Sequence, residues 1–204
     1  MEAFLQVVIN SIIEIIIFSI VPLIWWLATA KKKMNFFEWI GLHKFSISKE
    51  SKTPLWIVST TAVFLLVSLF ILYSIRNVST ATSSFSGMGI AAIPAVIVYG
   101  LFNTSLPEEI LFRGFLLKRF SNKLGFTVGN ILQSILFALL HGVMFFSKTS
   151  LWQTILITLL TGTIAWCMGY INEKKADGSI LPSWIIHASA NVFSALCSAF
   201  LLFQ

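Results

Sequence analysis

Long apolar segments alternate with short polar ones along most of the chain. The apolar segments cover residues 3–29, 54–75, 90–102, 128–146, 151–171 and 180–203. Most of them hold about 20 residues, the length that an α-helix needs to cross the hydrocarbon core of a bilayer. The pattern therefore predicts an all-α, polytopic integral membrane protein with about six to seven membrane helices, and a site buried in the helix bundle.

The segment 107–120, PEEILFRGFLLKRF, places two adjacent carboxylates and an arginine among apolar residues. Charged side chains inside a membrane segment are costly and mark a functional site by default. Glu109 and Arg113 are four residues apart, so on a helix they share a face and are predicted to form a structural ion pair. Glu108 points about 100° away from Glu109 and is predicted to be left without this partner.

A structural interpretation of Glu108 stands beside the functional one. The apolar segment 90–102 ends at the polar run Asn103-Thr104-Ser105, directly before the acidic segment. Pro107 suits the first turn of a helix, where its missing N–H is no loss. Ser105 would then cap that helix, and Ser105 and Glu108 would form an S-x-x-E capping box. This reading predicts a helix that is broken at 103–107.

Composition and charge narrow the class of protein. The chain is 57% hydrophobic and 11% charged. Its mean hydropathy of +0.88 is higher than that of ordinary soluble domains. A net charge of +6 could suggest nucleic acid, but the basic residues lie in loops between apolar segments. We read them as topology determinants, with the lipid bilayer and not nucleic acid as partner. The two cysteines, Cys167 and Cys197, lie in apolar segments and predict no disulfide.

The loop charges predict an orientation. Three basic groups are expected in the cytoplasm, which leaves only Arg76 and Lys148 outside. This arrangement puts both termini outside and requires residues 90–117 to cross the membrane once in total. The first apolar segment is expected to be a retained anchor, because it lacks a basic start and is too long for a signal peptide. The three basic groups are Lys31, Lys32, Lys33, Lys44, Lys49 and Lys52; Lys118, Arg119 and Lys123; and Lys174 and Lys175.

Two more polar patterns lie inside apolar segments. FALLH places Phe137 and His141 four residues apart, and HASAN repeats that spacing with His187 and Asn191. Counting about 1.5 Å per residue from the expected cytoplasmic ends puts His187, Glu108 and His141 at depths of roughly 10, 15 and 20 Å. These side chains are therefore expected to share one cavity. The remaining histidine, in the first basic loop, is read as solvated.

EEILFR, FALLH and HASAN resemble, in order and spacing, the three motifs of the CPBP family, also called Abi or CAAX-protease-and-bacteriocin-processing. The resemblance covers residues 107–191, and residues 1–106 carry no motif that matches. We therefore expect a single membrane domain over 1–204, with N-terminal helices and a basic cytoplasmic loop in 1–106 and a catalytic region in 107–191.

The resemblance implies an intramembrane endopeptidase that cleaves a peptide or membrane-protein substrate. The short loops and the lack of a targeting sequence indicate a bacterial plasma membrane. Water would attack the peptide carbonyl, with Glu108 and His141 as the base. His187 and Asn191 would donate hydrogen bonds to the developing oxyanion. Phe137 belongs to the second motif and is taken as a supporting residue.

Three alternatives remain open at this point. Glu108, His141 and His187 could hold a zinc ion with water in its fourth position. We favour no cofactor, because Asn191 is a poor zinc ligand but a good oxyanion donor. In function, the main rival is a non-proteolytic bacteriocin-immunity or partner-binding membrane protein, to which the family is also linked. A proton-coupled transporter is weaker, because no inverted repeat is visible.

Overall fold

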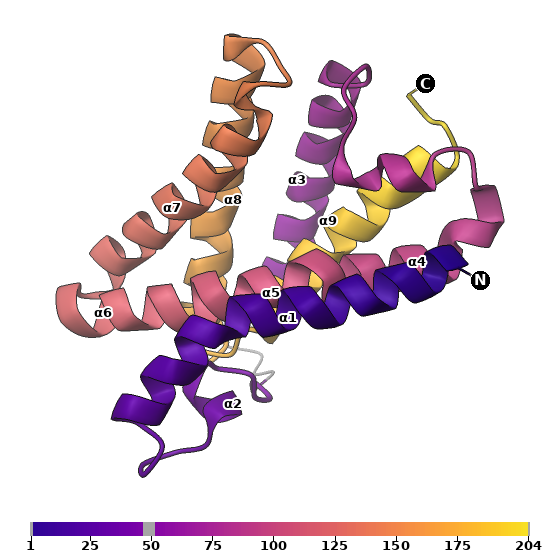
Figure 1. Ribbon diagram of the computed structural model, residues 1–204. Coiled ribbons are helices and arrows are strands. Elements are labelled where there is room, and N and C mark those ends of the chain that lie inside the picture. Colours follow the sequence, from indigo (N-terminus) through magenta and orange to yellow (C-terminus); the bar gives the residue numbers. More distant parts are fainter. Residues whose placement is uncertain (1, 47–51, 204) are drawn as a thin grey trace.

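The computed structural model describes residues 2–46 and 52–203, and every regular element within these ranges is a helix (Figure 1). The all-α prediction is confirmed. Lys49, one of the basic residues used to predict the topology, lies outside the described residues. The elements are α1 (Glu2–Thr29), α2 (Phe36–Trp39), α3 (Thr53–Ser74), η1 (Ala81–Phe85), η2 (Gly89–Ala92), α4 (Ile93–Val98), η3 (Tyr99–Ser105), α5 (Leu106–Glu109), η4 (Ile110–Leu117), α6 (Lys118–Leu124), α7 (Phe126–Phe146), α8 (Leu151–Lys175) and α9 (Leu181–Ala199).

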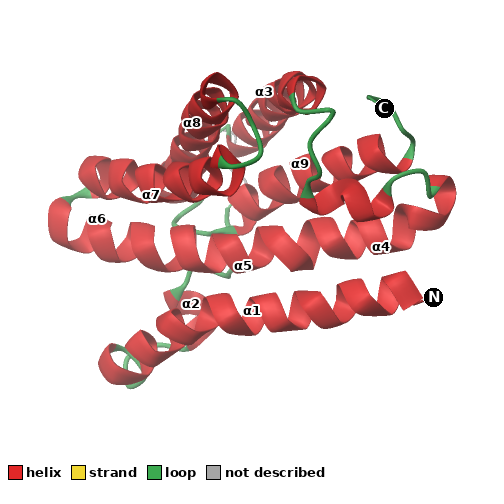
Figure 2. Cartoon of the chain, turned by 45° about the horizontal axis from the view of Figure 1, so that its top comes forward, coloured by secondary structure: helices red, strands yellow, loops and turns green. Residues whose placement is uncertain are grey.

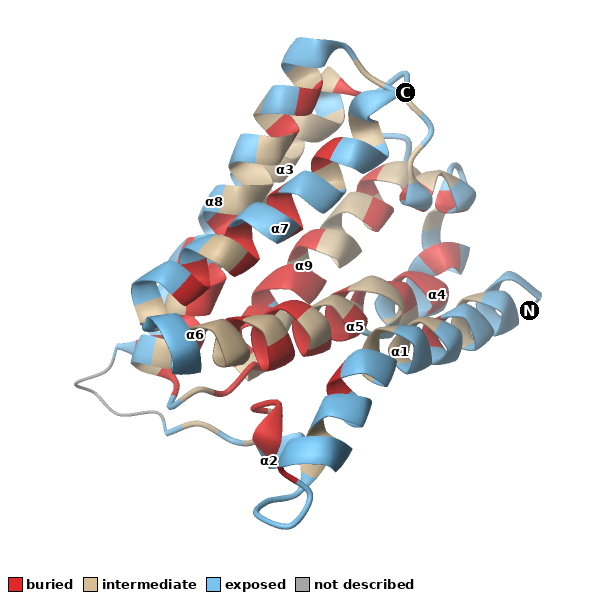
Figure 3. Ribbon diagram, turned by 60° about the vertical axis from the view of Figure 1, so that its left-hand side comes forward, coloured by how far each residue is buried: buried red, intermediate tan, exposed pale blue. Residues whose placement is uncertain are grey.

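The chain is a polytopic membrane protein. Within the described ranges, five helices are long and apolar enough to span a bilayer: α1, α3, the continuous helix Gly89–Leu124, α7 and α8. Many positions on these helices are exposed (Figure 3). The exposed side chains include many large apolar ones, as lipid contact requires. The sixth long helix, α9, has 19 residues and carries the HASAN motif in the interior of the bundle.

The segment that was predicted to be a broken helix is one uninterrupted helix. It runs from Gly89 to Leu124 through α4, η3, α5, η4 and α6, with α1 beside it (Figure 2). We call it the central helix. The single crossing predicted for residues 90–117 is compatible with this helix, but the break at 103–107 was wrong. With the break absent, the third apolar segment and the acidic segment form one helix.

The helix continues through Pro107 because its turns widen on either side. Residues Tyr99–Ser105 and Ile110–Leu117 are π-helical, a form found mostly as local bulges and often near functional sites. The Ser105 hydroxyl donates to the Gly100 carbonyl at 2.5 Å, and the Trp184 indole N–H donates to the Leu101 carbonyl at 2.8 Å. These side chains give main-chain oxygens of the widened turns a hydrogen-bond partner. The helix therefore does not end at Pro107.

Ser105 therefore does not cap a helix. Its backbone is helical and it makes no capping hydrogen bond. The capping-box interpretation of Glu108 was wrong, because the chain before Pro107 is already helical and offers no unpaired N-terminal turn.

A glycine sets the distance between the central helix and α9. A β-carbon on Gly100 would lie 2.4 Å from a methyl carbon of Val192 and 3.3 Å from the Ala188 carbonyl oxygen. Only glycine permits this approach of the two helices. The approach brings the acidic segment of the central helix within reach of the polar face of α9.

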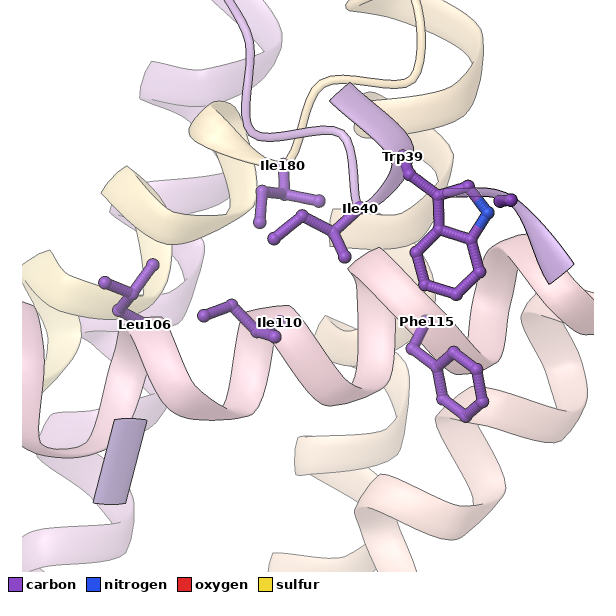
Figure 4. Close-up of a cluster of buried hydrophobic side chains, with 7 residues drawn as sticks. Trp39, Ile40, Leu106, Ile110, Phe115 and Ile180 are labelled. Carbon is purple, nitrogen blue, oxygen red and sulfur yellow. The ribbon is translucent and has the colours of Figure 1, made fainter. Parts of the chain in front are cut away.

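On its opposite side, the central helix packs on a buried apolar cluster (Figure 4). The cluster joins the short helix α2 and the turn before α9 to the central helix. Its labelled members are Trp39, Ile40, Leu106, Ile110, Phe115 and Ile180. This packing fixes the rotation of the central helix and thus the direction in which its carboxylates point.

The basic residues gather at one end of the bundle. Lys118 donates to Glu173 at 3.0 Å and to the Gly178 carbonyl at 2.6 Å, so the end of the central helix meets the end of α8. At the other end, the Gln153 amide donates to the Ser74 carbonyl at 2.7 Å and joins the start of α8 to the end of α3. The grouping supports the positive-inside orientation predicted above.

This orientation can be tested by labelling single cysteines. Asn122→Cys lies exposed at the basic end and Lys148→Cys lies at the opposite end. We expect a membrane-impermeant maleimide added to intact cells to label Lys148→Cys and to leave Asn122→Cys unlabelled until the membrane is opened. Labelling of Asn122→Cys from outside would reverse the predicted topology.

Candidate active site

Three helices bring the motif residues to one cavity of about 220 Å³. Glu108 comes from the central helix, His141 from α7, and His187 and Asn191 from α9. The cavity also has walls from α3, α8 and the segment around η1. The sequence predicted that these four side chains would meet, and they do. Their catalytic roles remain predictions.

The predicted ion pair is present and fully buried. Arg113 Nη1 donates to Glu109 Oε1 at 3.0 Å, and neither side chain is exposed to any degree. The guanidinium group also lies 4.4 Å from the centre of the Phe137 ring. Arg113 Nε and Nη2 have no hydrogen-bond partner among the described residues, so the carboxylate and the aromatic face are what compensates this buried charge.

Glu109 has a second partner that the sequence did not predict. His187 Nδ1 lies 2.9 Å from the same oxygen, Glu109 Oε1. A carboxylate oxygen accepts, so Nδ1 carries the proton and donates it. The ring of His187 is thereby oriented with Nε2 toward the cavity, as a carboxylate orients a catalytic or metal-bound imidazole elsewhere.

Glu108 lies on the other side of His187. Its Oε2 is 3.7 Å from His187 Nε2, beyond hydrogen-bond range. That oxygen is shielded from solvent and has no hydrogen-bond partner among the described residues. A buried carboxylate oxygen in this position calls for a donor from outside the protein, such as water or a substrate N–H.

His141 also presents Nε2 to the cavity. Its Nδ1 lies 3.0 Å from the Phe137 carbonyl oxygen, which can only accept. The neutral ring therefore carries its proton on Nδ1 and its lone pair on Nε2. The arrangement leaves a basic nitrogen without a partner from the described residues, on a side chain that shares the cavity with Glu108.

Phe137 holds the two histidines and the arginine in place. Its ring centre lies 4.5 Å from that of His141 and 5.9 Å from that of His187, the latter edge to face. Phe112 meets it edge to face at 5.0 Å. Phe137 is buried and touches several polar members of the site without a polar atom of its own, which fits the supporting role predicted for it.

Asn191 is held by two hydroxyl groups on the central helix. Its Nδ2 donates to Thr104 Oγ1 at 2.6 Å and to Ser105 Oγ at 3.0 Å. Because the Ser105 proton goes to Gly100, Ser105 accepts from Asn191, which settles the orientation of the amide. Both amide protons of Asn191 are thus engaged within the protein.

Thr104 and Ser105 were missed as site residues, because the run 103–105 was read as a helix break. One signal was available: Thr104 precedes Glu108 by four residues, so on a continuous helix the two share a face. Thr104 lines the cavity together with Glu108.

Replacing Ser105 by Ala should destabilise the protein by about 1–3 kcal/mol. The change removes the partner of a buried amide N–H and of a buried carbonyl at once. Thermal unfolding in detergent would measure it, with Ser189→Ala as control. Ser189 is half-buried on α9 and donates to the Ile185 carbonyl one turn back. Equal losses in the two variants would contradict a structural role for the Ser105 contacts.

The arrangement of the donors in the cavity also bears on metal binding. Within residues 2–46 and 52–203, no three His, Cys, Asp or Glu side chains lie together in an arrangement that holds a metal ion. Glu108, His141 and His187, the set considered for zinc, form no such group in this conformation, and the choice between zinc and no metal stays a prediction. His187 itself would remain able to bind a metal, because a carboxylate that accepts from Nδ1 is the usual partner of a metal-bound imidazole and Nε2 stays available.

Comparison with protein families places these residues in a known context. The family model described as type II CAAX prenyl endopeptidase, Rce1-like, matches residues 89–193. The match takes in the central helix, α7, α8 and most of α9, and hence all three motifs. No curated protein and no solved structure matches the chain significantly.

Proposed function

The chain belongs to the Rce1-like family of type II CAAX prenyl endopeptidases, and on this basis we propose a mechanism in which Glu108 and His141 activate water. The CPBP resemblance predicted from the three motifs is confirmed by this membership. The protein is a multi-pass membrane protein with intramembrane endopeptidase activity of the CAAX type, acting on peptide substrates. The particular residues and steps given below are our proposal.

One observation carries the mechanism. Glu108 Oε2 is buried without a hydrogen-bond partner among the described residues, in a cavity that it shares with two histidines. A water molecule has two protons to donate, and Glu108 and the lone pair of His141 Nε2 are two acceptors on one cavity. Held between them, the water would direct an oxygen lone pair at the substrate carbonyl.

The proposed reaction has two steps. The water oxygen bonds to the carbonyl carbon, the π electrons move to the carbonyl oxygen, and Glu108 takes the water proton. The tetrahedral intermediate then collapses, the C–N bond breaks, and Glu108 returns the proton to the departing amine. No step requires a group beyond the protein, the substrate and water.

His187 would stabilise the negative oxygen of the intermediate. Its Nε2 faces Glu108 across 3.7 Å, and Glu109 accepts the proton on its Nδ1 at 2.9 Å. Donation from Nε2 while Nδ1 donates to Glu109 requires a proton on both nitrogens when the oxyanion forms, and the Glu109 carboxylate would stabilise that charge. Glu109 would therefore support catalysis through His187, in addition to pairing with Arg113.

Asn191 would assist through Thr104. The amide donates to Thr104 Oγ1, so the hydroxyl proton of Thr104 is left to point into the cavity that it lines. A hydroxyl polarised in this way is a suitable second donor for the oxyanion. This relay replaces direct donation by Asn191, whose two amide protons are engaged.

The relay predicts a non-additive pair of variants. Asn191→Ala and Thr104→Val should each lower kcat by about 10²-fold, less than His187→Ala, with KM little changed. Because both act on one hydroxyl, the double variant should be no slower than either alone. Thr104→Ser keeps the hydroxyl and should restore most of the rate. If the reductions in kcat multiply in the double variant, the two residues act separately.

Metal dependence provides a separate test of the proposed water activation. We expect cleavage to survive EDTA and phenanthroline, and we expect elemental analysis of purified protein to find no stoichiometric zinc. His187→Ala should lower turnover without changing metal content. About one zinc per chain, lost in His187→Ala, would overturn this mechanism while leaving the peptidase activity in place.

The activity itself is tested with purified protein in lipid nanodiscs. A peptide that ends in a CAAX sequence would be offered with and without a prenyl group on its cysteine, and mass spectrometry would identify the products. The expected result is one cleavage near the C-terminus of the prenylated peptide. Failure to cleave either peptide would count against CAAX-type specificity.

A further inference from the structure

A second cavity, of about 550 Å³, lies at the basic end of the bundle, away from the catalytic cavity. We call it the basic pocket. It forms where α1 ends, between the lysine-rich turn that follows α1 and the last turns of the central helix. The residues that the argument uses are Trp25, Thr29, Lys33, Trp39, Arg119 and Lys123.

The basic pocket carries an excess of positive charge. Lys33, Arg119 and Lys123 line it, and Glu38 is the one acidic side chain among the described residues of its lining. Among the described ion pairs, none involves any of these four side chains. Three cations against one carboxylate leave the lining with a net positive charge, which favours an anionic ligand.

The side chain of Arg119 is held in the pocket wall and does not extend freely into solvent. Its guanidinium carbon lies 4.0 Å from the centre of the Trp39 ring. Its Nε is shielded from solvent and has no hydrogen-bond partner among the described residues. Trp39 and Trp25 each pack on Phe115, at 6.0 and 5.7 Å between ring centres (Figure 4 shows Trp39 and Phe115). The pocket therefore has a rigid aromatic frame that presents an oriented guanidinium.

An apolar groove leads out of the basic pocket along α1. It has a volume of about 350 Å³ and is lined by Val21, Ile24, Trp25, Ala28 and Thr29. Trp25 and Thr29 line both the groove and the pocket, so the two are continuous. The groove faces the lipid side, because its members are exposed on a membrane helix.

We propose that this continuous site binds one anionic phospholipid, with its phosphate headgroup in the basic pocket and an acyl chain in the groove. The charge of the pocket matches a phosphate, and the guanidinium of Arg119 suits phosphate oxygens. The groove decides between a lipid and a soluble phosphate, since only a lipid has a chain to fill it. The position fits as well, because tryptophans and basic residues at a helix end mark the membrane interface.

Lipid binding to the purified, delipidated full-length protein would test the proposal by native mass spectrometry. Phosphatidylglycerol, phosphatidylcholine with the same chains, and chain-free glycerol phosphate are the three ligands. We expect one phosphatidylglycerol per chain to bind in preference to phosphatidylcholine, and glycerol phosphate to bind far more weakly. Tight binding of glycerol phosphate would identify a soluble-phosphate site and overturn the lipid assignment.

Two matched double variants separate a site from general attraction. Lys33→Gln with Lys123→Gln removes two pocket charges and leaves the Arg119–Trp39 contact in place. The affinity for phosphatidylglycerol should fall about 30-fold, roughly fivefold for each basic residue near an anionic headgroup. Lys31→Gln with Lys32→Gln removes two exposed charges next to the pocket and should leave the affinity unchanged. Equal losses of affinity in the two double variants would show that the lipid is held by general electrostatic attraction, and would overturn the proposed site.

The groove has its own test. Ala28 is exposed on α1, so Ala28→Trp fills the groove without entering the protein core. It should weaken phosphatidylglycerol binding, and the thermal unfolding midpoint without lipid should stay the same. Unchanged lipid affinity in this variant would show that no acyl chain lies in the groove.

Discussion

Replacing Glu108 by Gln is expected to lower kcat by about 10²–10⁴-fold and to leave the fold intact. Gln keeps the shape of the side chain and removes the carboxylate that is proposed to take the water proton. The carboxylate pairs with His187 only across 3.7 Å, and its Oε2 has no hydrogen-bond partner among the described residues, so little stability is lost with it. Peptide cleavage and thermal unfolding, measured on the same preparation, would give both values.

Glu14→Gln is the matched control for this variant. The substitution makes the same chemical change at another position. Glu14 lies on α1 in a membrane segment and does not line the catalytic cavity. Its turnover should equal that of the unchanged protein. The pair also separates an enzyme from a partner-binding protein: a biological effect that survives Glu108→Gln would arise from binding and not from cleavage.

The helices could be predicted from the sequence because each lies within one apolar segment. The segment 54–75 became α3, Thr53–Ser74, and the segment 128–146 became α7, Phe126–Phe146. Length and hydropathy decide these elements locally, since the bilayer requires every backbone group to be paired within the segment. The Glu109–Arg113 pair was predictable for the same reason, because its spacing of four is a property of one helix.

The continuity of the central helix could not be read from local signals. Asn103, Thr104, Ser105 and Pro107 all favour a break in an isolated chain. What overrides them is tertiary: Asn191 and Trp184 on α9 bond to this stretch from across the bundle. A polar run thus became part of the site and not a connection.

The second bond of Glu109 was hidden for a related reason. The sequence spacing offered Arg113 as a partner and made Glu109 look fully assigned. His187 is 78 residues away along the chain, and only the close approach at Gly100 brings α9 near enough to share the carboxylate. Spacing can predict partners within one helix, whereas contacts between helices depend on packing that a single sequence does not reveal.

Breaking the Glu109–Arg113 pair should cause the largest loss of stability in the protein. Both side chains are completely buried, 3.0 Å apart. Glu109→Gln or Arg113→Ala leaves one charge without its partner in a low dielectric, at a cost of about 3–5 kcal/mol. The free energy of unfolding, measured in detergent, should fall by this amount in each variant, and Glu108→Gln should not share the loss.

A second ion pair provides the control. Lys118 and Glu173 also lie 3.0 Å apart, but their side chains are 14% and 22% exposed. Water can solvate what Glu173→Gln leaves behind, so this variant should lose only about 1 kcal/mol. If Glu109→Gln lowers the free energy of unfolding by no more than Glu173→Gln does, burial does not make the Glu109–Arg113 pair the more costly one to break.

Removing both charges separates the two roles of Glu109. In the double variant Glu109→Leu with Arg113→Met, no buried charge is left alone, and apolar side chains of similar volume often replace such a pair without loss. Stability should therefore recover well above that of either single variant. Turnover should not recover, because His187 has lost the carboxylate that accepts its Nδ1 proton and aims its Nε2. A double variant that is both stable and fully active would show that Glu109 serves the fold alone.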